Sequence, residues 1–152
     1  MSQLHRVRLA HWVVKHGVSL GGLTPEDRGL LFALVWAAMP AGPFTERQVN
    51  EALRAQLDGA AACLNTDHVE LRRWLVDAGW LQRDGFGREY RRTSLDDVLN
   101  EAARDAAREL HSMDVGAWAA RLRADHDAHR EARRQAWQGG QRPQAPAAGS
   151  TA

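Results

Sequence analysis

The side chains best suited to binding chemistry gather between residues 66 and 92. Arginine dominates this stretch, and a guanidinium group can form paired hydrogen bonds with a phosphate or with the edge of a guanine base. Hydroxyl and imidazole groups near its start can also contact phosphate or bases. The candidate nucleic-acid contacts are Thr66, His68, Arg72, Arg73, Arg83, Arg88, Arg91 and Arg92.

Each half of this stretch also has an ordinary structural interpretation. Glu70–Arg73 and Arg73–Asp77 have helical spacing, so they could be ion pairs on a solvated face. Arg72 has no such acidic neighbour and is the better candidate for reading a base. In residues 83–92 basic side chains outnumber acidic ones, which suits phosphate contact. The alternative is a charged edge strand that prevents strand addition.

Patterns for catalysis or metal binding are weaker. His126 and His129 are three apart, which would put two imidazoles on one helical face, but no third ligand is apparent nearby. Cys63, the only cysteine, lies in an alanine-rich stretch without an activating neighbour, as expected of an inert thiol. A phosphate-cradling glycine loop and a nucleophile elbow are both absent from the sequence. We therefore expect no enzymatic activity, no metal and no cofactor.

The charge balance limits how the chain could bind nucleic acid. There are 20 basic and 19 acidic side chains, for a formal net charge of +1. Binding through bulk charge is therefore excluded, and any such contact must come from local patches. The apolar run at residues 30–39 is too short to span a bilayer, and the N-terminal residues lack the apolar run of a signal peptide. We expect a cytoplasmic protein with no membrane partner.

Capping residues and apolar periodicity predict three short helices in residues 24–79. Thr24 followed by Pro25 is typical of a helix start, and Thr45 with Gln48 fits a capping box. A third helix begins at Asp67, and its apolar residues recur at spacings of three and four. The expected ranges are 24–39, 45–58 and 67–78.

A β-hairpin is predicted directly after the third helix. Two short strand candidates, residues 80–83 and 88–92, flank the turn sequence Asp-Gly-Phe-Gly at 84–87. Three helices followed by a hairpin is the order of a winged helix-turn-helix. The expected fold is thus mainly α, a winged helix-turn-helix with a small β-hairpin, plus a C-terminal helical pair.

The chain divides into four segments on this interpretation. Residues 1–23 hold an N-terminal helix, indicated by the spacing of Leu4, Val7, His11 and Val14, and a glycine hinge. Residues 24–93 form the winged-helix domain, 94–137 a C-terminal helical extension, and 138–152 a disordered tail rich in small and polar residues. The two C-terminal helices either fold back onto the domain or pack on a second copy as a homodimer.

The stretch from Phe44 to Arg92 resembles a bacterial family known as domain of unknown function family 2087. The resemblance implies a winged-helix protein, because members look like winged-helix proteins and some are joined to transcription-regulator domains. It supplies no catalytic residues. This chain differs from those fused members, since it has no second DNA-binding domain and adds the C-terminal helical pair. The matching residues are Phe44, Thr45, Glu46, Val49, Asn50, Asp67, His68, Leu71, Arg72, Arg73, Leu75, Val76, Asp77, Gly79, Leu81, Arg83, Tyr90 and Arg92.

Two functions follow as hypotheses. The first is a non-enzymatic, DNA-binding transcriptional regulator, or a winged-helix domain associated with one, whose partner is duplex DNA. The second is a protein–protein interaction module, in which the C-terminal helices hold a partner and the hairpin never meets DNA.

Overall fold

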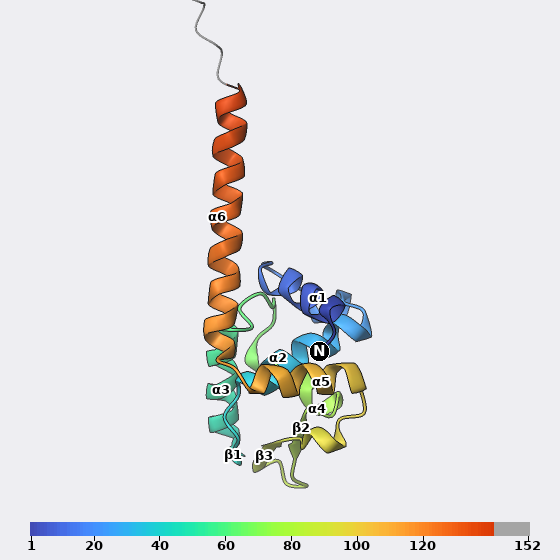
Figure 1. Ribbon diagram of the computed structural model, residues 1–152. Helices are drawn as coiled ribbons and strands as arrows, with labels where there is room; N and C mark the ends of the chain where they lie inside the picture. The colour runs from blue at the N-terminus through green and yellow to red at the C-terminus, as the bar shows by residue number, and fades with distance from the viewer. Residues whose placement is uncertain (142–152) are drawn as a thin grey trace, which may run out of the picture.

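The computed structural model describes residues 1–141, which form six α-helices and a small antiparallel sheet (Figure 1). Two short 3₁₀ turns, Leu20–Gly22 and Leu95–Asp97, join some of these elements. Within the described residues no helix is long and apolar enough to cross a membrane. The helices are α1 (Gln3–Val13), α2 (Pro25–Ala38), α3 (Glu46–Asp58), α4 (His68–Asp77), α5 (Glu101–His111) and α6 (Val115–Gln141), and the strands are β1 (Phe44–Thr45), β2 (Leu81–Arg83) and β3 (Glu89–Arg92).

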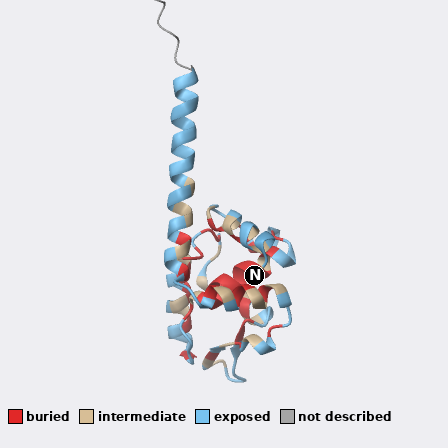
Figure 2. Cartoon of the chain, in the orientation of Figure 1, coloured by how far each residue is buried: buried red, intermediate tan, exposed pale blue. Residues whose placement is uncertain are grey.

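Helix α2 is the centre of the core. Its residues from Gly29 to Ala37 are all buried, as expected of a helix that is apolar on every side. Helix α5 packs along it, and α1, α3 and α6 also contact it. Figure 2 shows the buried residues concentrated along this central helix. The helices around it therefore need only one apolar face each.

The predicted helix starts are confirmed by their caps. The Thr24 hydroxyl accepts the Asp27 N–H at 3.2 Å, and the Asp67 carboxylate accepts the Glu70 N–H at 2.8 Å. Thr45 and Gln48 form both hydrogen bonds of a capping box. These side chains satisfy N–H groups that no helical carbonyl can reach.

The sheet has one strand more than the sequence predicted. The hairpin of β2 and β3 is present, with Leu81 opposite Arg92, but β1 pairs with the other edge of β3, so the order is β1-β3-β2. Strand β1 is two residues long and merges into the start of α3. A segment this short shows no alternation, which is why the pattern alone missed it.

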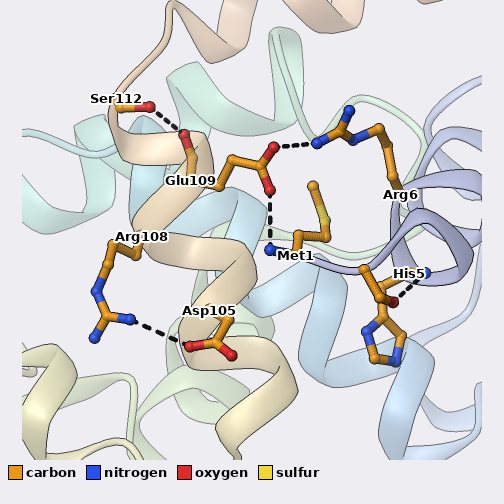
Figure 3. Close-up of polar contacts among 8 residues, drawn as sticks. Met1, His5, Arg6, Asp105, Arg108, Glu109 and Ser112 are labelled. Carbon is orange, nitrogen blue, oxygen red and sulfur yellow. Dashed lines mark hydrogen bonds and ion pairs between the residues drawn. The ribbon is translucent and has the colours of Figure 1, made fainter.

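Helix α1 forms where its apolar spacing indicated, but it buries other residues than those in that pattern. Leu9 and Val13 are fully buried, whereas Leu4 is 63% exposed and Val7 is also exposed. The N-terminal end of α1 is tied to α5 by Glu109, whose carboxylate pairs with the Met1 amino group at 3.1 Å and with Arg6 (Figure 3).

The C-terminal helices fold back onto the body of the protein in their first part. Helix α5 lies on α2, and the start of α6 contacts α1 and α2. Helix α6 then runs on past the rest of the described fold to Gln141, four residues beyond the predicted end at Trp137 (Figure 1). Residues 142–152, most of the predicted disordered tail, lie outside the described residues.

One side chain of α6 joins three segments of the chain. The Arg123 guanidinium donates hydrogen bonds to the carbonyl oxygens of Val13 (3.2 Å), Gly59 (2.8 Å) and Ala60 (2.8 Å). These carbonyls belong to the ends of α1 and α3, where helical partners run out. Arg123 therefore serves as a shared C-terminal cap and anchors α6 to the body.

We predict that Arg123→Ala lowers the free energy of unfolding by about 1–3 kcal/mol, because it leaves helix-end carbonyls without a donor. Arg121→Ala, at an exposed position on the same helix, is the matched control and should change stability by less than about 0.5 kcal/mol. Urea unfolding followed by circular dichroism measures both. Equal effects of the two substitutions would contradict the anchoring role.

Candidate nucleic-acid-binding surface

A groove separates α4 from the β2–β3 hairpin and contains several of the predicted contact residues. It encloses a hollow of about 180 Å³. Helix α4 supplies one wall, and the sheet supplies the other wall through Arg83 and Tyr90. We call this feature the α4–hairpin groove; its lining residues are Val69, Arg72, Arg73, Val76, Asp77, Arg83 and Tyr90.

Three predicted contacts have exposed and unpaired guanidinium groups. Arg73 and Arg83 line the groove from opposite walls, and Arg88 lies beyond it on the hairpin. Within residues 1–141, none of the three guanidinium groups forms an ion pair or a hydrogen bond. The alternative pairs of Arg73 with Glu70 and Asp77 are therefore not formed. These three arginines keep their charge available to a partner.

Arg72 is engaged inside the fold instead. Its Nη1 donates to the side-chain oxygen of Asn50 at 2.7 Å and lies 3.3 Å from a Glu46 carboxylate oxygen, while the guanidinium lies over the Tyr90 ring. Only 17% of the side chain is exposed. The premise for preferring Arg72 over Arg73 as a base reader, that Arg72 has no acidic neighbour, is therefore wrong. Its acidic partner comes from α3, which a search along one helix could not find.

Arg92 is also turned toward the core. Its Nη1 donates to the carbonyl oxygens of Trp36 (3.1 Å) and Met39 (3.0 Å), and its guanidinium lies 4.3 Å from the centre of the Trp36 ring. Burial lowers the pKa of this guanidinium. The assignment of Arg92 as a phosphate contact is corrected accordingly: this side chain caps the end of α2.

The remaining predicted contacts have partners of their own near the surface. Arg91 forms an ion pair with Glu89 at 2.7 Å, which reduces its net charge toward a partner. The half-buried Thr66 donates its hydroxyl to the Asp67 carbonyl oxygen at 3.3 Å. His68 Nε2 lies 3.2 Å from Nη2 of Arg54 on α3. The contact of His68 therefore brings a basic side chain of α3, Arg54, next to the start of α4.

The sequence interpretation missed a second basic region at the side of α3. An open hollow of about 670 Å³ lies between the exposed face of α3 and the hairpin, where Arg47, Arg54 and Arg88 are accompanied by Glu46 and Glu51. Arg47 pairs with Glu51 at 3.2 Å. The sequence analysis did not single out these residues, because basic and acidic side chains alternate along α3. The β1–β3 pairing brings the hairpin beside it.

The single thiol lies away from this surface. Cys63 is fully buried, and desolvation raises the pKa of its thiol to about 11. In the part of the chain that the structure describes, no cluster of three or more histidine, cysteine or acidic side chains could hold a metal ion.

The chain is thus a small, mainly helical protein with an arginine-lined groove between a helix and a hairpin. Residues 24–92 match the family model described as an uncharacterized protein conserved in bacteria, domain of unknown function family 2087. The resemblance noted in the sequence is confirmed, and the match begins twenty residues before Phe44, at the cap of α2. Neither the curated proteins nor the solved structures contain a match to this chain.

We predict that Arg92→Ala destabilises the protein by about 1–3 kcal/mol, because two carbonyl oxygens at the end of α2 lose their donor. Arg91→Ala, the neighbouring position on the exposed face of β3, should change the free energy of unfolding by less than about 0.5 kcal/mol. Thermal and urea unfolding of the two variants provide the comparison. A neutral Arg92→Ala would show that this side chain is free for a partner.

We also predict that Cys63 reacts very slowly with a thiol reagent at about pH 8 while the protein is folded, since burial keeps the sulfur protonated and inaccessible. Addition of denaturant should release one fast-reacting thiol per chain. With an aromatic disulfide as the thiol reagent, the absorbance of the aromatic thiolate that it releases measures the extent of reaction. Fast modification of the folded protein would contradict the buried position.

Proposed function

We propose that this protein is a non-enzymatic, DNA-binding winged-helix module that acts as a transcriptional regulator or as a domain associated with one. The element order α2-β1-α3-α4-β2-β3 supports the winged-helix assignment. In this assignment α3 and α4 form the helix-turn-helix, and the β2–β3 hairpin is the wing. Helix α4 is then the recognition helix, the element that enters the major groove in such proteins.

The main support for the proposal is that two arginines without an ion-pair partner among the described residues face the α4–hairpin groove from opposite walls. Arg73 comes from the recognition helix and Arg83 from the wing, and both line one hollow. A phosphate between them would receive hydrogen bonds from two elements at once, which fixes its position as well as its charge. Arg88 extends the positive charge along the wing.

Acidic side chains on α4 limit the strength of the DNA contact that we propose. Asp77 lines the groove, and Glu70 is exposed on α4. Both repel phosphate, and Arg72 is held by Asn50 and Glu46. The proposal is therefore weak binding dominated by the DNA backbone, in which Arg73 contacts phosphate rather than a base.

A specific observation also favours the interaction-module function. The outer turns of α6 are exposed from Ala124 to Gly140 apart from the half-buried His126, and Trp137 near its end is 65% exposed (Figure 2). Most of the stability of a helix in a protein comes from tertiary packing, so a protein partner or a second copy would stabilise these exposed turns. This function uses α6 and leaves the wing free.

Fluorescence anisotropy with a labelled short duplex tests the DNA-binding proposal. We expect binding that weakens steeply between about 50 mM and about 200 mM salt. The double variant Arg73→Ala/Arg83→Ala should lower affinity for all sequences alike and reduce the salt slope by about one per lost phosphate contact. Arg108→Ala, an exposed arginine paired with Asp105 on α5, is the matched control and should bind as the wild type does.

Two results would contradict the proposal. Absence of binding at micromolar protein, or binding that is insensitive to salt, would exclude a phosphate-contacting groove. Equal losses in the double variant and the Arg108→Ala control would show that the groove is not where the DNA lies. Light scattering on the same samples reports whether two copies associate, which is the outcome that the α6 function predicts.

A further inference from the structure

Phe86 lies at the tip of the wing. Among the described residues it is the most exposed aromatic side chain. It is 84% exposed and does not pack against the hydrophobic core. Trp74, Trp80 and Tyr90, the other aromatic residues of α4 and the wing, all lie in or against that core. Exposure of a phenyl ring on a small protein is costly in water, so a contact that covers it would be favourable.

The turn that carries Phe86 is closed by hydrogen bonds among its own residues. The Asp84 side chain accepts the Arg88 N–H at 2.8 Å, and its backbone carbonyl accepts the Gly87 N–H at 3.1 Å. These backbone N–H groups, that of Arg88 first, lower the pKa of the Asp84 carboxyl. Gly87 has a φ of +67°, a conformation that favours glycine. The turn is therefore ordered by its own residues before any partner arrives.

Two arginines belong to the same turn region as the exposed ring. The Arg83 guanidinium lies against Gly87, since a Cβ at that glycine would approach Arg83 Nε to 2.8 Å. Arg88 follows on the other side of the turn with a free, exposed guanidinium. Of the two acidic groups at this end of the hairpin, Asp84 directs its carboxylate at backbone N–H groups, and Glu89 pairs with Arg91. A partner that covers Phe86 must therefore be negatively charged around an apolar or aromatic surface.

Duplex DNA has this combination, with phosphates at the groove edges and stacked bases between them. We propose that Phe86 is a wedge that enters the minor groove and inserts between two base pairs, while Arg83 and Arg88 contact the flanking phosphates. Apolar side chains on minor-groove proteins unstack base steps in this way and bend the duplex. This inference rests on the DNA-binding function proposed above and adds a residue and a mode of contact to it.

The test uses the full chain and a duplex with 2-aminopurine at a central pyrimidine–purine step, which is the most easily unstacked kind. Wild-type protein should raise 2-aminopurine fluorescence as it binds. Phe86→Ala should abolish that rise and weaken binding about tenfold, the scale of one lost base–aromatic contact. Phe86→Trp should keep both. Leu99→Ala removes a side chain that is 97% exposed outside the wing, and as the matched control it should change neither.

The outcomes separate the wedge from the DNA-binding function. Anisotropy that shows binding without any 2-aminopurine signal would overturn the wedge and leave the function standing, as would unchanged binding by Phe86→Ala. Tighter binding to the single strand than to the duplex would also overturn insertion. No binding by the wild type would overturn both proposals. Circular dichroism should show that Phe86→Ala is folded, because this side chain makes no core contact.

Discussion

The contact between the end of α2 and the end of β3 positions the surface that we assign to binding. Trp36 donates its indole N–H to the Thr93 carbonyl oxygen at 2.9 Å, while Arg92 covers the Trp36 ring and caps the α2 carbonyls. This interaction joins the most buried helix to the sheet. With β3 fixed in this way, β2 and the hairpin lie beside α4, and the groove between them has a defined width.

The arginines of the chain divide between those with acceptors inside the fold and those that are exposed without one. Three arginines donate hydrogen bonds to acceptors in other segments of the chain, and so supply polar contacts that apolar packing cannot. They are Arg72, Arg92 and Arg123. Arg73 and Arg83 have no such acceptors among the described residues and lie on one groove. The neighbours that folding brings together therefore decide which arginines are held inside the fold and which stay available to a partner.

Local signals in the sequence predict much of the fold but little of this division. Caps such as Thr24 and Thr45 act within four residues, so the helix starts and the hairpin turn are readable from the chain. The partners of Arg72 lie 22 and 26 residues away, and those of Arg92 lie 53 and 56 residues away. Strand β1 likewise exists because β3 pairs with it. Interactions of this range depend on the tertiary structure, and neither periodicity nor spacing encodes them.

We propose above that the α4–hairpin groove contacts duplex DNA. Amide chemical shifts of the full chain, measured by nuclear magnetic resonance during titration with a duplex, would locate the contact without any substitution. We expect shifts that cluster at residues 69–77 of α4 and 83–91 of the hairpin. Shifts confined to α1 or to the outer turns of α6, with the groove unchanged, would contradict it.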